Sequence, residues 1–207
     1  MKKYLLTTFL IALSYFSIAQ PRIGLMVAPS LSYGRVKYPT DTIKNNGSTL
    51  LFKFGLEFDF MMSDNYAFST GLLYSPERLA IKAIDASSGS FVEEYRVQYL
   101  QIPATLKLFT NEVAQDLKVY FQIGFLGEIL LNSEPTETDF TLINGFKFYD
   151  FSFTGGAGVE YGAGVNSIIY GGIFYEHGLV NVINGYETND EIISRLSNFN
   201  FKVGLKF

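Results

Sequence analysis

The single histidine, His177, is the residue of this chain best suited to acid–base chemistry, and it stands in the stretch FYEHGLV at 174–180. An imidazole titrates near neutral pH, and it activates a nucleophile when a serine and an orienting carboxylate or amide converge on it. No nucleophile motif accompanies His177, and the serines of the expected loops are scattered. We expect a histidine that hydrogen-bonds to a neighbour, and we predict that the chain is not an enzyme and has no catalytic residue.

Metal and phosphate chemistry find little support in the sequence. Metal sites built from histidine or cysteine are excluded, because the chain has one histidine and no cysteine. The acidic stretches SEPTETD (133–139) and GYETNDE (185–191) lack the ligand spacing of a calcium loop. GGAGVEYGAG (155–164) opens no helix, so its glycines indicate tight packing or a turn rather than a phosphate loop. We expect no metal and no cofactor.

The composition departs from that of a water-soluble domain. Of the 207 residues, 48% are apolar and only 17% are charged, against about a quarter charged in ordinary soluble domains. No stretch after residue 20 approaches the roughly 20 apolar residues of a membrane-spanning helix. The apolar residues must therefore be spread in a pattern. The formal net charge of −4, without a basic stripe, argues against nucleic acid as a partner.

The first 19 residues read as a secretory signal peptide. Lys2 and Lys3 precede an apolar segment, 4–16, and Ser17-Ile18-Ala19 supplies the small residues of a cleavage site. We expect cleavage after Ala19 and a mature chain, 20–207, that forms one domain. The absence of cysteine excludes disulfide bonds and a lipid-modified N-terminal cysteine.

The mature chain shows a repeated alternation of apolar and polar residues. The last ten residues, NFNFKVGLKF, are apolar at every odd position from Phe199 to Phe207, and TLLFKFGLEFDFMM (49–62) and LKVYFQIGFLGEIL (117–130) alternate in the same way. Successive side chains of a β-strand point to opposite faces, so this period of two predicts strands. Eight segments qualify, at about 22–36, 49–62, 66–84, 94–109, 116–131, 146–161, 167–181 and 196–207.

The connections between these segments alternate in length. Long polar connections are expected at 37–48, 85–93, 132–145 and 182–195, and short ones at 63–65, 110–115 and 162–166. Short turns at one end and long loops at the other are typical of an up-and-down antiparallel barrel. An even strand count returns the C-terminus to the end where the barrel begins.

Two barrels fit this pattern: a soluble secreted one with its apolar face inward, and a membrane barrel with that face toward lipid. Strand length favours the membrane, because five outward residues on a strand tilted about 40° span roughly 25 Å, the height of the apolar band. The polar faces carry small residues and charges of both signs, as a narrow lumen requires. The charged ones are Lys53, Glu57, Asp59, Lys107, Lys118, Glu128 and Glu160.

Tyrosines near the ends of the segments are a third indication, because amphipathic rings gather at membrane interfaces. They are Tyr33, Tyr66, Tyr74, Tyr99, Tyr149, Tyr161 and Tyr170. We therefore predict an all-β fold, an eight-stranded antiparallel up-and-down transmembrane β-barrel, integral to the cell outer membrane. Pro103, which cannot donate to a strand ladder, and a change of apolar parity before it predict a bulge near 99–103.

Two resemblances add to this interpretation. The final strand, with its terminal Phe207, resembles the signal recognised by the machinery that assembles outer-membrane barrels. Tyr99-Leu100-Gln101-Ile102-Pro103 and Gly71-Leu72-Leu73-Tyr74 resemble motifs of the PorT-like outer-membrane β-barrel family. That family's namesake acts in protein secretion through the type IX system, so the resemblance implies an accessory role in secretion.

The expected function is non-enzymatic: an integral barrel with a side-chain-filled lumen that presents extracellular loops to other proteins. The alternatives are a small outer-membrane enzyme acting on envelope lipids and a narrow solute channel. The expected partners are outer-membrane lipids, the barrel-assembly machinery through the strand that ends at Phe207, and secretion-system or envelope proteins.

Overall fold

The computed structural model describes residues 21–37, 43–85, 89–138, 143–164, 166–186 and 193–207. The expected signal peptide, 1–19, lies outside these residues. The described chain is all-β. No helix within it is long and apolar enough to cross a membrane.

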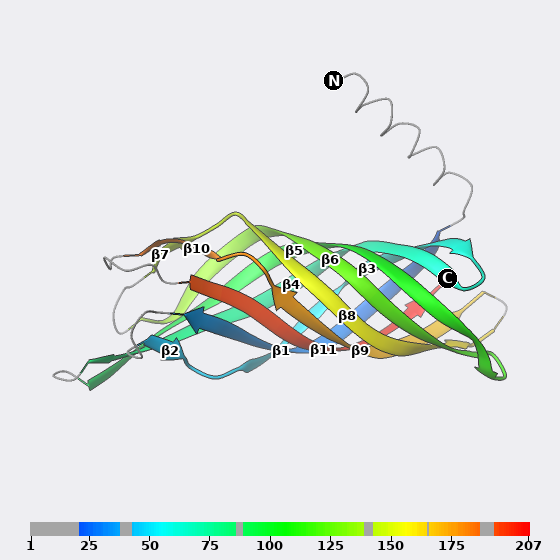
Figure 1. Cartoon of the computed structure of the whole chain (residues 1–207), viewed down its shortest axis with the longest axis horizontal. Helices are drawn as coiled ribbons and strands as arrows, with labels where there is room; N and C mark the ends of the chain where they lie inside the picture. Colours follow the sequence, from blue (N-terminus) through cyan, green and yellow to red (C-terminus); the bar gives the residue numbers. More distant parts are fainter. Residues whose placement is uncertain (1–20, 38–42, 86–88, 139–142, 165, 187–192) are drawn as a thin grey trace, which may run out of the picture.

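Eight long strands close into one antiparallel barrel (Figure 1). They are β1 (Arg22–Lys37), β3 (Thr49–Ser63), β4 (Tyr66–Asp85), β5 (Gly89–Ala114), β6 (Leu117–Thr138), β8 (Tyr149–Gly162), β9 (Ile168–Gly178) and β11 (Ile193–Lys206). Each long strand pairs with the next one along the chain, and β11 returns to pair with β1. At the seam the backbone of Ile23 exchanges two hydrogen bonds with that of Phe207. The predicted eight-stranded meander is confirmed.

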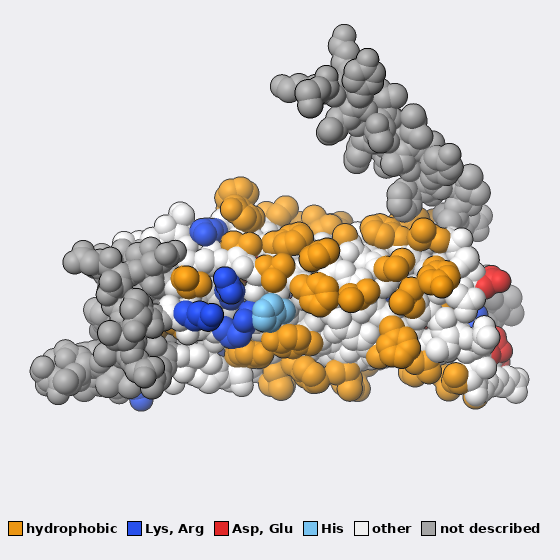
Figure 2. All heavy atoms as spheres, in the orientation of Figure 1, with side chains coloured by type: hydrophobic (Ala, Val, Ile, Leu, Met, Phe, Trp, Pro, Cys, Tyr) orange, Lys and Arg blue, Asp and Glu red, His pale blue; other side chains and the backbone are white. Residues whose placement is uncertain are grey.

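The two faces of the strands point as the alternation predicts. On β3, Phe52 and Phe54 are each more than half exposed on the outer surface, whereas Lys53 is buried in the lumen. Exposed apolar side chains surround the middle of the barrel in the view of Figure 2. Open sheet edges and unpaired backbone groups are not tolerated in lipid, and closure removes both. The apolar belt is therefore the surface that contacts the membrane.

The end of the barrel with the long connections, which is the extracellular end in outer-membrane barrels, is taller than the sequence indicates. The expected loop at 85–93 is mostly strand, because β4 reaches Asp85, β5 begins at Gly89, and the two pair up to Asp85–Gly89. In the same way β6 continues to Thr138, well into the expected loop at 132–145. Above the membrane, polar residues do not end a strand, because both faces of the sheet can be exposed to water there. The backbone hydrogen bonds between the strands continue regardless.

Three short strands complete this end of the barrel. β2 (Ile43–Asn45) pairs with β4, and β7 (Ile143–Phe146) pairs with β10 (Ile183–Tyr186) in a separate two-stranded sheet. The β7–β10 ladder continues in a hydrogen bond from Lys147 N to Val182 O. Val182 N in turn donates to Ser194 O of β11, which ties the sheet to the barrel. It forms a lid at the end opposite the termini (Figure 1).

The bulge predicted near 99–103 does not change the parity of β5, and in that respect the prediction is wrong. Along β5 the inward positions keep one parity through Val97, Tyr99, Gln101 and Pro103, and pairing with β4 has no register shift. The shift beside Tyr99 occurs in the ladder with β6. Pro103 instead interrupts the β4 ladder without changing its register. The apparent parity change arises because the extracellular part of the lumen is itself apolar.

The seven tyrosines predicted to be interfacial divide into five on the outer surface and two inside the barrel. Tyr33 and Tyr74 are half-buried and share the outward parity of Leu31 and Leu72. Tyr66, Tyr149 and Tyr161 are about half exposed on the outer surface, where membrane interfaces place such rings. Tyr99 and Tyr170 are fully buried inside the barrel, so their assignment to the belt is wrong. Both have inward parity on their strands, which only the register reveals.

Candidate functional site

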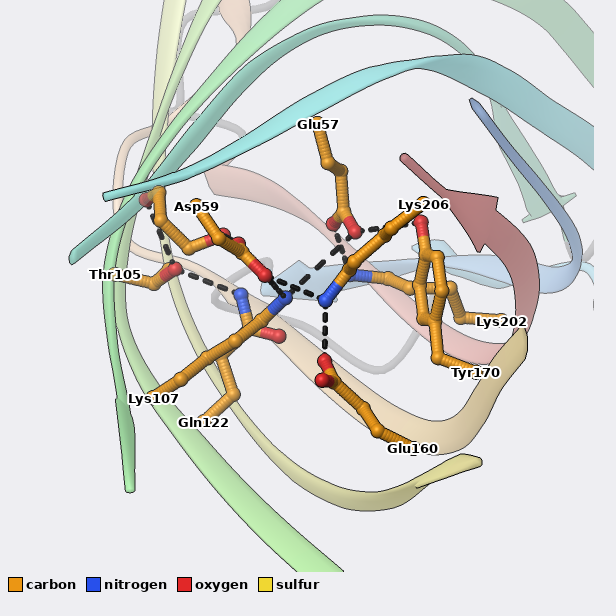
Figure 3. Close-up of polar contacts among 10 residues, drawn as sticks. Glu57, Asp59, Thr105, Lys107, Gln122, Glu160, Tyr170, Lys202 and Lys206 are labelled. Atoms are coloured by element: carbon orange, nitrogen blue, oxygen red, sulfur yellow. Dashed lines mark hydrogen bonds and ion pairs between the residues drawn. The ribbon is translucent and has the colours of Figure 1, made fainter. Parts of the chain in front are cut away.

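The lumen is the most densely organised polar region of the described chain, and its periplasmic part is a network of paired charges (Figure 3). Three lysines and three carboxylates make up this periplasmic layer: Glu57, Asp59, Lys107, Glu160, Lys202 and Lys206. Their formal charges cancel. A narrow barrel can bury ions only when they are paired and hydrogen-bonded.

Asp59 is the centre of the periplasmic layer. Both of its carboxylate oxygens lie 3.0 Å from Lys107 Nζ, and one also accepts from Lys206 at 2.5 Å. Ser69 donates its hydroxyl to the same carboxylate. Lys206 also pairs with Glu160, which brings the last strand against β8. One carboxylate thus joins β3, β4, β5 and β11.

Glu57 lies on the extracellular side of the same layer. Its carboxylate accepts from Lys202 Nζ at 2.5 Å and from the hydroxyl of Tyr170 at 2.8 Å. The ring of Tyr170 lies against Gly204, where a Cβ atom would come within 2.5 Å of the ring carbons. Gly158 leaves room for Tyr120 in the same manner. The glycines of the polar faces therefore make space for lumen aromatics, as the Gly-rich segment predicts.

A middle layer above this network carries more carboxylates than cations. Lys53 Nζ lies 2.5 Å from Glu176 and 3.5 Å from Glu77. Gln101 donates to Glu128 at 2.7 Å, and Asn198 donates to Glu77 at 2.5 Å. Asp150 lies directly opposite Glu128 in the β6–β8 register. Between the two layers the side chains leave a cavity of about 20 Å³, which has room for one or two water molecules.

The extracellular part of the lumen is filled by apolar side chains. This apolar plug consists of Leu79, Ile81, Val97, Tyr99, Ile143, Val182, Ile183 and Leu196. The lid strands β7 and β10 supply Ile143 and Ile183, each about 97–98% buried. The ring of Tyr95 meets that of Phe146 edge-on, 5.2 Å apart, at the margin of the plug. Charged layers below and an apolar plug above obstruct the axis of the barrel at three levels.

Above the membrane the extended β4–β5 hairpin has its own ion pair. Arg78 donates to the carboxylate of Glu94 and, at 2.9 Å, to the carbonyl oxygen of Asn46. The hydrogen bond from Arg78 holds the pKa of Glu94 below its ordinary value. This pair ties the hairpin to the segment that follows β2.

His177 lies on the outer surface at the extracellular end of β9, not in the lumen. Its Nδ1 is 3.3 Å from the hydroxyl of Tyr175, in agreement with the expected hydrogen bond to a neighbour. Ser197 lies directly opposite His177 on β11, but its Oγ accepts from Arg35 Nε at 2.9 Å and it is fully buried. Within the described chain His177 makes no hydrogen bond to a serine or a carboxylate. Whether the chain has an enzymatic activity stays a prediction.

The other candidate segments are structural where they are described. Residues 133–138 of SEPTETD form the end of β6, and only 185–186 of GYETNDE lie within the described chain. Among the described residues no group of three or more acidic, histidine or cysteine side chains could hold a metal ion. The sequence pattern identifies most charges of the lumen, but it places Lys118 there too, and Lys118 is only half-buried at the periplasmic rim.

The sequence analysis does not single out several charged residues of the lumen, among them Glu77, Asp150, Glu176, Lys202 and Lys206. For the two lysines the signal is present, because they occupy even positions of a terminal strand whose odd positions are apolar. Glu176 could be found by the same parity from Ile173 and Tyr175. Glu77 follows Pro76, where the alternation is broken.

A closed antiparallel barrel with an apolar belt and a charge-paired lumen defines an integral outer-membrane β-barrel protein. The chain belongs to the family described as outer membrane protein beta-barrel domain, whose family model matches residues 18–184. The protein is thus integral to the outer membrane. A search of curated protein sequences finds no match.

Solved outer-membrane barrels are similar in fold. The outer membrane protein OprG from Pseudomonas aeruginosa gives a TM-score of 0.50 at 11% identity, over 91% of this chain and 97% of that one. The outer membrane protein AlkL, determined in DMPC lipid bilayers, gives a TM-score of 0.50 at 14% identity, over 91% of this chain and 90% of that one. At such identities the similarity shows the fold alone.

Proposed function

We propose that the protein is a non-enzymatic interaction barrel, which presents its extracellular end to other envelope proteins. The observation that carries this proposal is the contrast between the lumen of the barrel and the strands that extend above the apolar belt. The lumen is filled with side chains, while β4, β5 and β6 continue above the belt as a paired extension. The paired strands above the apolar belt are not needed to cross the membrane. They form a rigid surface of the kind that binds a partner.

The filled lumen supports an interaction role over the alternative of a narrow channel. A solute would have to displace the apolar plug, the middle layer and the periplasmic layer in turn. Removing a partner from a buried ion pair is costly, so these layers are poor gates.

The surroundings of His177 support a non-enzymatic role over that of an enzyme acting on envelope lipids. An acyl-transfer site needs a nucleophile that its base can deprotonate. Here the nearest serine by register, Ser197, accepts a hydrogen bond from Arg35. If the purified barrel shows any lipid-modifying activity, replacing His177 by alanine should leave that activity unchanged. Loss of the activity in His177→Ala would favour the enzyme.

The PorT-like resemblance supports a finer proposal, an accessory role in protein secretion of the type IX kind. The motif residues are architectural in this barrel: Tyr99 belongs to the apolar plug, and Thr70 donates to the carbonyl oxygen of Pro103 at 2.6 Å. They therefore point to a shared scaffold. The role itself has to be tested through partners.

Partner capture tests the interaction role. A tagged barrel would be crosslinked in intact cells and compared with a variant in which a two-residue turn replaces residues 82–92. We expect the parent to capture a defined envelope partner and the shortened variant to lose it while its folded gel band persists. Equal capture by both forms, or capture by neither, would contradict the proposal, and a captured secretion component would support the finer one.

We also propose that the final strand is recognised by the barrel-assembly machinery and that the signal peptide is removed after Ala19. Removing Phe207 should impair insertion in cells more than Phe207→Tyr does, because the tyrosine retains an aromatic terminus. Spontaneous folding of both variants in detergent is the control for closure, since the backbone of Phe207 also pairs with Ile23. The intact mass of the mature protein tests the cleavage site.

A further inference from the structure

Two arginines and the single histidine lie together on the outer surface where β1, β11 and β9 leave the apolar belt. The rim cluster, as we call it, consists of Arg35, Arg195 and His177. Figure 2 shows basic side chains around the single histidine, directly beside the extracellular margin of the apolar surface. All three residues share the outward parity of the apolar residues below them.

Arg35 and Arg195 are direct cross-strand neighbours in the β1–β11 register. Side chains directly opposite one another have Cβ atoms about 4.5–5.5 Å apart, and like charges there are destabilising. Among the described residues, no carboxylate lies within 4.0 Å of either guanidinium. Arg78, a comparable arginine on β4, does have such a partner in Glu94. Among the residues that the structure describes, the two arginines of the rim cluster therefore carry positive charge without a carboxylate partner.

The guanidinium group of Arg35 is held in place by two hydrogen bonds. Arg35 donates from Nε to Ser197 Oγ and from one terminal nitrogen to Gly178 O, both at 2.9 Å. A guanidinium has five N–H donors in a fixed fork, so three remain for a ligand. Nε of Arg195 is buried and has no hydrogen-bond partner.

Two hydroxyl groups border the cluster on its membrane side. The hydroxyl of Tyr33 lies 3.2 Å from that of Tyr175, which lies 3.3 Å from Nδ1 of His177. This chain of polar groups crosses β11 and links β1 to β9. It marks the level at which the surface changes from polar to apolar.

The cluster stands at the height of lipid headgroups. Leu31, Ile173 and Phe199 are each 45–47% exposed on the same three strands, and each is four residues from a member of the cluster. Four residues of strand span about 13 Å along the strand, and tilt reduces the height. A ligand at the cluster would have its hydrophobic part against the belt.

We propose that the rim cluster binds the phosphate group of an anionic lipid in the outer leaflet, with the acyl chains against Leu31, Phe199 and Ile173. Guanidinium groups match phosphate oxygens bidentately and form charge-assisted hydrogen bonds. A bound phosphate also removes the repulsion between Arg35 and Arg195. This site is separate from the interaction role of the extracellular end and does not depend on it.

Native mass spectrometry of the mature chain, refolded in an uncharged detergent, tests the proposal with diphosphoryl lipid A and its dephosphorylated form as probes. We expect the unaltered protein to bind only the phosphorylated lipid. The double variant R35Q/R195Q should bind it about tenfold to a hundredfold more weakly, as the loss of hydrogen bonds to a charged group predicts. The matched control is R22Q/K118Q, which removes two positive charges at the periplasmic rim and should bind as the parent does.

The lipid comparison on the unaltered protein needs no variant, so the test stands even if R35Q/R195Q does not fold. Equal binding of the dephosphorylated lipid would overturn the proposal, and so would undiminished binding by a folded R35Q/R195Q. Inorganic phosphate distinguishes a lipid from a free anion. If it displaces the lipid at the concentration at which the lipid itself binds, the assignment to a lipid is wrong.

Discussion

Among single residues, Asp59 accepts hydrogen bonds from two buried lysines and from Ser69, so the periplasmic layer depends on its charge. Asp59→Asn keeps the size of the side chain but leaves Lys107 and Lys206 with less negative charge than the layer requires. Breaking a buried ion pair by removing one partner costs about 3–5 kcal/mol. We expect that loss in the free energy of unfolding, measured in urea by the fraction that keeps the mobility of the folded form on gels.

Asp64→Asn is the matched control for Asp59→Asn. Asp64 lies exposed in the turn between β3 and β4. Its replacement by asparagine removes the same charge but leaves no buried cation without a partner. Its free energy of unfolding should stay within about 0.5 kcal/mol of the parent. Similar losses for both variants would mean that net charge, and not the network, stabilises the barrel.

Phe121 tests which face of the barrel contacts lipid. Its side chain is 54% exposed in the outward row of β6, where the alternation predicts it. Phe121→Arg should cost about 2–4 kcal/mol of barrel stability in lipid vesicles, the range for arginine at the bilayer midplane. The same change at Met62, at the periplasmic end of β3, should cost about 0–1 kcal/mol. Equal costs at the two positions would contradict the position of the belt.

Parity explains how much of this chemistry can be read from the sequence. Lys53, Glu57 and Asp59 alternate with phenylalanines, so their inward orientation could be predicted without coordinates. Tyr99 and Tyr170 could not be placed, because a tyrosine suits both an interface and a filled lumen. The pairing of Arg35 with Arg195 depends on the register between the first and last long strands, 160 positions apart in the chain. Local pattern carries no information about that register.

Among the elements, the β7–β10 lid is a two-stranded sheet that the sequence analysis does not predict. All its residues except Phe146 fall in segments expected to be loops, and its strands pair with each other, not with the barrel strands. Ile183→Asp places a charge in the apolar plug and should release the lid without unfolding the barrel. Hydrogen exchange at 143–148 and 179–186 should become faster, while exchange in β1, β3 and β11 stays slow.

Asn144→Asp adds the same charge on the exposed side of β7 and is the control for the lid. Its exchange should match that of the parent. If Ile183→Asp leaves the lid protected, the plug does not hold β10 in place. If it exposes the whole barrel, lid and barrel form one cooperative unit.

The β4–β5 extension should respond to pH through Glu94. The hydrogen bond from Arg78 lowers the pKa of this carboxyl, so its contribution is present above the unfolded pKa, about 4.3, and is lost as the pH falls through the lower folded value. We expect proteolysis of the hairpin to be slow at pH 7 and to increase below about pH 4. In Glu94→Gln the carboxylate is absent at every pH, so a persisting acid response would exclude this pair as its cause.

The elements themselves were predictable to different degrees for physical reasons. Inside the belt, lipid requires alternation, and the predicted segments agree with β1, β3 and β8 to within a few residues. Above the belt that requirement ends. The chain could therefore continue as strand up to Asp85, again from Gly89, and through the polar segment 132–138 without any signal in its hydropathy. Asp116, with φ 58° in the turn before β6, lies one residue beyond the short connection expected at 110–115, because β5 continues through most of that connection to Ala114.

At the scale of the whole molecule, the three filled levels of the lumen predict that the barrel does not conduct ions. An eight-stranded barrel has an interior just wide enough for side chains, and here those side chains are charged pairs below and an apolar plug above. In planar bilayers the refolded protein should give no stepwise conductance. Ile183→Asp should remain silent as well, because the middle layer around Lys53 and Glu176 still crosses the lumen beneath the opened lid. Steps in the parent would contradict the filled lumen, and steps in Ile183→Asp alone would show that the plug is the only barrier and that the charged layers admit ions.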